Sequence, residues 1–278
     1  MKRRSYYLIH CLISFHFLLL LVSCAHKSGH SNKAYLTINK KVNGDTITKQ
    51  SSFLNLLAQK TGDCNQILLE RRGYNLSYNP TLLIPNWVAW RLTAEHVNGD
   101  CPRDNTYYED EDVSYPKATN EDYKGSGWSK GHMCPAGDNK WDSEAMRESN
   151  LLTNVCPQHA SLNSGVWNVI ERDCRKWAKR YGELYIVCGP VLLNKEHETI
   201  GINKIVVPEA FFKVILRLKP EPTAIGFVIR NNEGKKKKDQ YINTVDDVER
   251  ITGIDFFPFL EDSVEDIVEA SSNIEDWK

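Results

Sequence analysis

The alternation of apolar and polar positions predicts a sheet-rich domain. Residues 74–78 read Tyr-Asn-Leu-Ser-Tyr, and a turn with two prolines at 80–85 joins them to a second strand-like run. Further β-rich runs follow in the second half of the chain. The predicted strands are residues 74–78, 87–93, 184–193, 205–218 and 223–230. Residues 98–127 are polar and acidic, so we expect a loop there.

The strongest helical pattern covers residues 162–181, where the apolar residues are Val166, Trp167, Ile170, Cys174, Trp177 and Ala178. We expect Ser161 to cap the start of this helix and Gly182 to end it. Asn163 and Glu171 differ by only about 80° around a helix axis, so both can face one site. Taken alone, the pattern favours a surface helix with an i,i+4 pair between Glu171 and Arg175.

Shorter helices are expected at residues 52–60, 64–72 and 245–252, and an apolar segment at 254–260. No internal repeat or linker divides this part of the chain. We therefore expect one domain over residues 51–278, which is long enough to bury a sizeable core.

The N-terminus is typical of an export signal. Lys2, Arg3 and Arg4 precede an apolar run over 8–22 that suits a signal peptide better than a spanning helix. The run ends Leu-Val-Ser-Cys, which resembles the lipobox of bacterial lipoproteins. We expect residues 1–23 to be removed and Cys24 to carry the lipid. An uncleaved anchor helix or an ordinary cleaved signal are the alternatives.

The lipid predicted on Cys24 determines where in the cell we expect the protein to be. Residues 24–50 would form a tether and N-terminal extension, and the lipid on Cys24 would anchor an exported protein to a membrane. Its domain would occupy the periplasmic or the cell-surface face. Removal of Cys11 and lipidation of Cys24 leave six cysteines, at 64, 101, 134, 156, 174 and 188. An even number in an exported protein favours disulfides, but the sequence does not choose among the pairings.

Composition fits a globular protein, with 41% hydrophobic and 26% charged residues and a net charge of -1. The net charge differs strongly between segments of the chain. Residues 123–180 and 181–245 carry 9 and 10 basic against 6 and 7 acidic residues, whereas 246–278 carry 2 against 11. The charge balance therefore does not exclude a nucleic-acid substrate. The four lysines at 235–238 are either a solvated loop tip or a contact to nucleic acid. We expect removal of the acidic end after Phe259 to raise DNA affinity.

Ordered motifs in the middle of the chain carry the chemistry. Residues 128–141 read WSKGHMCPAGDNKW, and residues 148–158 read ESNLLTNVCPQ. Asn163, Trp167 and Glu171 follow, and later blocks read YIVCGP and TGIDFFP. This ordered set resembles the DNA/RNA non-specific endonuclease family over about residues 74–260. The resemblance implies an α+β fold, with a central, mainly antiparallel sheet flanked by helices and a ββα-metal finger as the active site.

The resemblance also implies roles for single residues. His132 would be the general base and Asn163 the one direct protein ligand of a hydrated Mg²⁺, for which Mn²⁺ could substitute. Glu171 and Asn154 would hold metal-bound water. Lys130, Arg175 and Arg103, the last in the loop before the signature, would supply positive charge to the phosphate. The substrates would be DNA and RNA, and some relatives form homodimers.

Two positions depart from the family signature, which usually reads Asp-Arg-Gly-His. Ser129 replaces the Asp, and Lys130 replaces the Arg and loses its two-pronged grip on phosphate. This departure and the acidic balance motivate an alternative, a non-catalytic surface lipoprotein that captures nucleic acid. A zinc site is a further alternative, because His132-x-Cys134 and Cys156-x-x-His159 have suitable spacings.

Overall fold

The computed structural model describes residues 57–60, 65–232 and 234–278. The chain divides into two units, residues 1–40 and 41–278, and every described residue lies in the second. The predictions for residues 1–23, 24–50 and Cys24 fall outside the described residues. No helix in the described part is long and apolar enough to cross a membrane.

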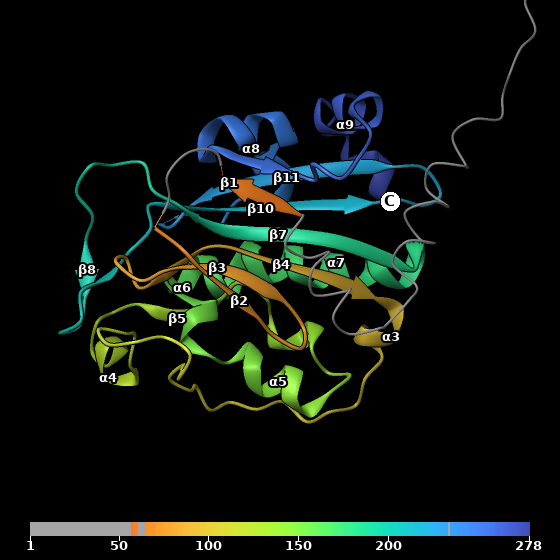
Figure 1. The fold of residues 1–278 in the computed structure, drawn as a ribbon. Helices are drawn as coiled ribbons and strands as arrows, with labels where there is room; N and C mark the ends of the chain where they lie inside the picture. Colours follow the sequence, from red (N-terminus) through yellow and green to blue (C-terminus); the bar gives the residue numbers. More distant parts are fainter. Residues whose placement is uncertain (1–56, 61–64, 233) are drawn as a thin grey trace, which may run out of the picture. The chain divides into compact units, whose positions relative to one another are not determined.

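An antiparallel sheet of seven strands forms the centre of this unit (Figure 1). Its order is β12-β11-β10-β7-β4-β3-β2, and all six neighbouring pairs run antiparallel. The strands are β2 (Ile67–Glu70), β3 (Asn75–Asn79), β4 (Ile84–Thr93), β7 (Glu183–Val191), β10 (Ala210–Arg217), β11 (Thr223–Arg230) and β12 (Ile242–Asn243).

Smaller strand pairs and short helices surround the sheet. The paired strands are β1 (Ala58–Lys60) with β13 (Ile254–Phe256), β5 (Ser129–His132) with β6 (Val155–Gln158), and β8 (Thr199–Ile200) with β9 (Ile205–Val206). The α-helices are α3 (Ala94–Val97), α4 (Asn120–Tyr123), α5 (Ser143–Ser149), α6 (Ala160–Leu162), α7 (Asn168–Tyr181), α8 (Val245–Thr252) and α9 (Asp262–Glu269). The other helical segments are η1 (Ala136–Asp138), η2 (Leu152–Asn154), η3 (Asn163–Trp167), η4 (Lys238–Tyr241) and η5 (Ile274–Trp277).

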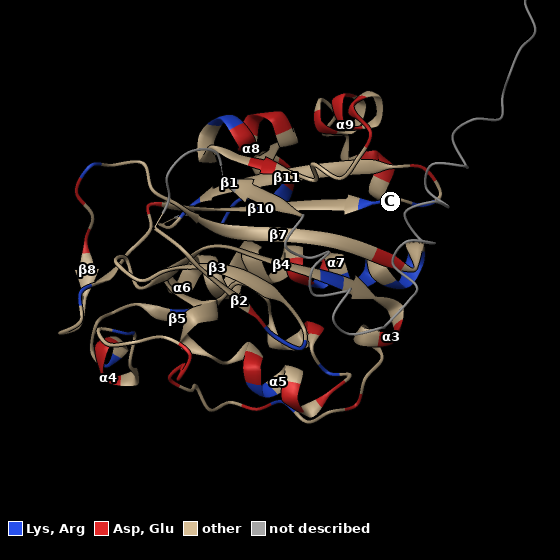
Figure 2. Cartoon of the chain, viewed as in Figure 1, with Lys and Arg blue, Asp and Glu red and all other residues tan. Residues whose placement is uncertain are grey.

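Side chains that alternate along β10 separate two faces of the sheet. Phe211 and Lys213 point to one face, where both contact the ring of Trp167. Phe212 points to the other face and packs on Phe256 of β13. The main hydrophobic core fills the first face, beneath α7. Helix α8 packs on β11, and both α8 and α9 are rich in acidic residues (Figure 2).

Most predicted strands are confirmed. The runs 184–193 and 223–230 correspond to β7 and β11, and the helix at 245–252 to α8. The run 205–218 is interrupted between β9 and β10, at a segment that contains Pro208. The expected α+β fold with an antiparallel sheet and flanking helices is likewise confirmed.

Two short helix predictions are wrong. Residues 67–70 form the edge strand β2, whose Leu69 is buried while Leu68 is 51% exposed. This period-2 pattern is too short to be distinguished from one helical turn by sequence. The helix expected at 52–60 mostly falls outside the described residues, but its end is the strand β1. There Ala58 pairs with Phe256, nearly 200 residues later in the sequence.

Candidate active site

Two short strands and a helix form the expected ββα finger. Strand β5 pairs antiparallel with β6, and α6, η3 and α7 follow directly. Lys130 and His132 are two residues apart on β5 and therefore share a face. Gly131 lies between them, where a Cβ would approach Gln158 Oε1 to 2.3 Å. The Gly-His pair in the motif thus reflects close packing of the two strands.

The helix of the finger is not continuous. Residues Asn163–Trp167 form a π-helical turn, and Gly165 inside it has φ -92° and ψ -121°. A Cβ on Gly165 would come within 2.8 Å of the carbonyl oxygen of Gly234, so the kink lets the lysine-containing loop approach. Such π turns often occur at functional sites. The expected N-cap at Ser161 is wrong, because His159 caps α6, whereas the expected end at Gly182 is confirmed.

His132 is a buried, neutral imidazole. Its side chain is 9% exposed, and Nε2 lies 2.8 Å from the side-chain oxygen of Asn150. Burial lowers the pKa of His132 to about 4, although the Asn150 contact acts in the opposite direction. With Nε2–H donating to Asn150, Nδ1 carries the free lone pair that a general base needs. The ring of Tyr107 lies 5.2 Å away, centroid to centroid.

Arg103 and Glu171 lie in electrostatic range of this site. Arg103 is exposed, and its charge lowers the pKa of both His132 and Glu171. Burial nevertheless raises the pKa of Glu171 to about 7, and the nearby carboxylate of Asp138 adds to this effect. Arg103 is therefore close enough to act electrostatically on both His132 and Glu171.

A buried lysine, Lys213, acts electrostatically on Glu171. Lys213 is 0% exposed, and its ammonium lies 4.7 Å from the ring of Trp90 and 4.5 Å from the ring of Trp167. The buried thiol of Cys188 lies within range of this ammonium. Burial opposes its charge, but neighbours that include Glu171 raise the pKa of Lys213 above its ordinary value. Lys213 is therefore a charged support for Glu171.

Arg175 pairs with Asp138 rather than with Glu171. Its guanidinium donates to Asp138 Oδ1 at 2.8 Å, and Trp90 Nε1 donates to Asp138 Oδ2 at 3.0 Å. The carboxylate of Asp138 is 1% exposed and the side chain of Arg175 is 21% exposed. The plain surface helix with a Glu171–Arg175 ion pair is therefore not what the chain forms. Asp138 instead fixes Arg175 at the edge of the site.

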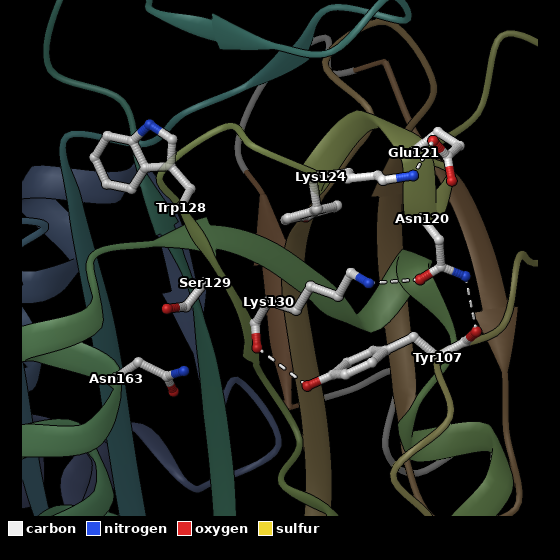
Figure 3. A pocket seen from close by; sticks show the side chains of 9 residues that line it. Tyr107, Asn120, Glu121, Lys124, Trp128, Ser129, Lys130 and Asn163 are labelled. Atoms are coloured by element: carbon white, nitrogen blue, oxygen red, sulfur yellow. Dashed lines mark hydrogen bonds and ion pairs between the residues drawn. The ribbon is translucent and has the colours of Figure 1, made fainter.

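A cavity of about 700 Å³ opens beside β5 (Figure 3). A ring of three hydrogen bonds holds Lys130 there. Lys130 Nζ donates to Asn120 Oδ1 at 2.6 Å, and Asn120 Nδ2 donates to the carbonyl of Tyr107. The Tyr107 hydroxyl closes the ring by donating to the carbonyl of Lys130. The amide of Asn163 enters the same cavity beside Ser129. Because Tyr107 also contacts His132, it joins this cavity to the buried base.

The amide of Asn154 is buried and hydrogen-bonded to the backbone. It is 0% exposed, and its amide donates to the carbonyls of Cys134 and Ser149 and accepts from the Cys134 N–H. These contacts clamp the segment that follows His132. Asn154 therefore positions the segment after His132, and its expected role toward metal-bound water stays a prediction.

The donor set fits a hard divalent cation. Asn163 and Glu171 offer amide and carboxylate oxygens, which Mg²⁺ prefers, and Asn163 faces an open cavity with room for water ligands. The zinc alternative is not supported. In the part of the chain that the structure describes, no His, Cys, Asp or Glu group close enough to hold a metal includes residues 132, 134, 156 or 159.

The disulfide prediction is wrong for the described cysteines. Cys101, Cys134, Cys156, Cys174 and Cys188 are all free thiols, and the last four are buried. Cys64 lies outside the described residues. These four buried thiols pack as small apolar side chains in the core.

Sequence reasoning missed several residues of the site. Asn150 and Tyr107 contact His132, Asp138 holds Arg175, and Lys213 lies below Glu171. Three of them had a signal: Asp138 and Asn150 lie inside the quoted motif blocks, and Lys213 interrupts an otherwise apolar strand. Tyr107 lies in a polar loop without periodicity, so nothing in the pattern distinguished it.

A family model described as DNA/RNA non-specific endonuclease matches residues 55–263. The chain belongs to the DNA/RNA non-specific endonuclease family. This confirms the resemblance carried by the ordered motifs, and the family match includes every predicted site residue between Arg103 and Arg175.

Named relatives agree with this assignment. The chain is 38% identical over 207 residues to mitochondrial nuclease EXOG of Xenopus laevis, covering 68% of this chain and 58% of the relative. It is 34% identical over 210 residues to nuclease C1 of Cunninghamella echinulata var. echinulata, covering 69% and 83%. This chain thus spans little more than half the length of the EXOG relative.

A solved structure shares the fold. It is described as the EndoG/EndoGI complex and the mechanism of EndoG inhibition, and the match has a TM-score of 0.69 at 27% identity. The match covers 80% of this chain and 95% of the other. This likeness confirms the expected ββα-metal architecture.

Proposed function

We propose that the chain is an Mg²⁺-dependent nuclease that hydrolyses phosphodiester bonds of DNA and RNA. The observation that carries the proposal is the buried, neutral His132, oriented by Asn150 on the same finger that presents Asn163 to an open cavity. Membership of the endonuclease family supports it. Mn²⁺ is the expected substitute for Mg²⁺.

Each side chain of the site has its own role in the proposed hydrolysis. His132 Nδ1 takes the proton from the attacking water, and the hydrogen bond to Asn150 stabilises the imidazolium that forms. Asn163 would bind the Mg²⁺ directly, and Glu171 would orient the water around it. The bound cation would supply Lewis-acid stabilisation of the leaving oxygen. Lys130, Arg103 and Arg175 supply positive charge around the phosphate.

Export and membrane attachment are part of the proposal and rest on the sequence alone. We propose that Cys24 carries a lipid and that the nuclease domain faces the periplasm or the cell exterior. Labelling of cells with a radioactive fatty acid should mark the protein, and Cys24→Ala should abolish the label. A label retained in Cys24→Ala would contradict the anchor. A homodimer, as in some relatives, is tested by light scattering of the purified domain.

The catalytic proposal is tested with plasmid DNA and with RNA. We expect degradation of both in Mg²⁺ and none in EDTA. His132→Ala should lower the rate by about 10²–10⁴, the usual contribution of a positioned base. Asn163→Ala should lower it by at least about 10², because even an indirect contact to a metal is worth about 10–100-fold.

Matched controls keep the test specific. His197→Ala and Asn194→Ala change the same residue types in the segment after β7, outside the strands and helix of the finger, and should retain activity. Nucleic acid that is bound but never cleaved by the wild-type chain would favour the alternative, a surface lipoprotein that only captures nucleic acid.

A further inference from the structure

The acidic residues near the C-terminus form a cluster that the nuclease function does not use. Asp246 and Glu249 are one helical turn apart on α8, and Glu269 is the last residue of α9. One carboxylate oxygen from each of the three lies within 4.8 Å of the other two. The cluster belongs to the α8 side of the sheet, opposite the finger, where Figure 2 shows acidic residues on both α8 and α9.

Glu269 points to a ligand in this cluster. Its side chain is buried, with 6% of the residue exposed, and Oε1 has no hydrogen-bond partner among the described residues. An unpartnered buried carboxylate oxygen is costly, because water is removed and nothing replaces it. Burial and the charges of Glu249, Glu265, Asp246 and Asp255 raise the pKa of Glu269 to about 9.

No basic side chain in the described part of the chain neutralises the cluster. The guanidinium of Arg250 is paired with Asp247, on the same helix. None of Asp246, Glu249 and Glu269 forms an ion pair with a described residue. Several carboxylates this close require either shared protons or a cation between them.

We propose that Asp246, Glu249 and Glu269 form a second divalent-cation site, separate from the catalytic one and of the kind that binds Ca²⁺. Ca²⁺ takes oxygen ligands at about 2.3–2.6 Å in flexible geometry, so two ligands on opposite sides of one ion can be about 4.8 Å apart. The oxygens of the cluster meet this limit. Mg²⁺, with shorter bonds and strict octahedral geometry, fits an incomplete and flexible set less well.

The site would be structural. The other function of Glu249 is to accept a hydrogen bond from the Phe256 N–H at 2.7 Å through Oε1. A cation held by Glu249 and Glu269 would therefore connect α8 and α9 to β13, the strand that pairs with β1. It would tie the end of the chain to the start of the domain.

Calorimetric titration of the full chain, first stripped with EDTA, tests this site. We expect Ca²⁺ to bind in the submillimolar to millimolar range typical of extracellular modules, and to raise the melting temperature. Glu269→Gln and the exposed Asp246→Asn should each weaken Ca²⁺ binding by at least about tenfold. Mg²⁺ should bind these carboxylates more weakly. The matched control Glu196→Gln, in an exposed segment after β7, should bind Ca²⁺ like the wild type.

The variant Asn163→Ala distinguishes the catalytic site from the proposed Ca²⁺ site. That variant should keep the Ca²⁺-induced rise in melting temperature, whereas Glu269→Gln should lose the rise and keep Mg²⁺-dependent cleavage. Equal Ca²⁺ affinity in wild type, Asp246→Asn and Glu269→Gln would overturn the proposal. The proposal would also be overturned if Ca²⁺ left the melting temperature of the wild type unchanged while Glu269→Gln had a higher melting temperature than the wild type in EDTA. That result would identify carboxyl groups that share a proton.

Discussion

The chemistry of the site depends first on how single charged groups are buried. Burial shifts the two pKa values in opposite directions: it lowers that of His132 to about 4 and raises that of Glu171 to about 7. His132 is buried and Glu171 is half-buried, and perturbed pKa values of this kind are common at functional sites. Neither shift follows from the sequence, because both depend on packing of β5 and α7 against the sheet.

We expect the imidazole of His132 to titrate near pH 4 in the metal-free protein, against 6.5 for an ordinary histidine. Because the folded-state pKa is lowered, the unfolded chain takes up this proton first on acidification. This group therefore reduces stability as pH falls from about 6.5 to about 4, by roughly 3 kcal/mol in total. NMR titration in EDTA checks the value. Arg103→Gln should raise the pKa of His132 and Arg230→Gln should not; equal titration curves would contradict the role of Arg103.

Lys213 should set the ionisation of Glu171. Its charge lowers the pKa of Glu171, so Lys213→Met should raise that pKa and leave the carboxyl protonated at neutral pH. We expect the acid limb of the pH–rate profile to move to higher pH by about one unit, with activity regained in alkaline buffer. Lys195→Met, in an exposed segment, is the control. A uniform loss of activity at every pH would instead indicate that Lys213 only supports packing between Trp90 and Trp167.

At the scale of elements, sequence predicted long periodic runs well and local breaks poorly. The strand at 223–230 and the helix at 245–252 have the bounds that the pattern indicated. The break at Asn163–Trp167 was missed because it depends on Gly234, a tertiary contact far along the chain. The expected disulfides failed for a related reason: cysteine number reveals neither burial nor distance. The motif order located Asn163, Glu171 and His132, but not the residues that hold them.

Packing between β5 and β6 should make residue 131 intolerant of any side chain. In Gly131→Ala the new Cβ would meet Gln158 Oε1 at 2.3 Å and Gln158 Cβ at 2.6 Å. We expect a loss of roughly 1–3 kcal/mol in the free energy of unfolding, measured by urea denaturation, because overpacking forces side chains off their rotamers. The double variant with Gln158→Ala removes the clashing amide and should recover part of the loss. No recovery would place the strain in the backbone instead.

At the scale of the whole molecule, the basic loop at 235–238 and the acidic helices α8 and α9 lie on different faces of the sheet. The finger and the lysines at 235–238 belong to one side, because Gly165 of the π turn touches Gly234 and both border one cavity. The acidic helices cover the other side. Removal of the chain after Phe259 is therefore a poor test of charge. It would also delete Trp277, which is 1% exposed and lies 4.7 Å from the ring of Trp177.

Charge changes that leave the fold intact should separate the two faces. A triple variant with Gln at positions 235, 236 and 237 should bind DNA more weakly. It should also reduce the slope of log affinity against log salt concentration by about 0.9 for each phosphate that the lysines no longer neutralise. Neutralisation of Glu261, Asp262 and Asp266 changes as many charges on the acidic helix α9 and its N-cap. We expect that variant to leave affinity nearly unchanged, since screening acts within about 8–10 Å at physiological salt. Fluorescence anisotropy with a labelled duplex, using the inactive His132→Ala background, measures both. Equal effects of the two triple changes would mean that net charge, not the local basic face, controls binding.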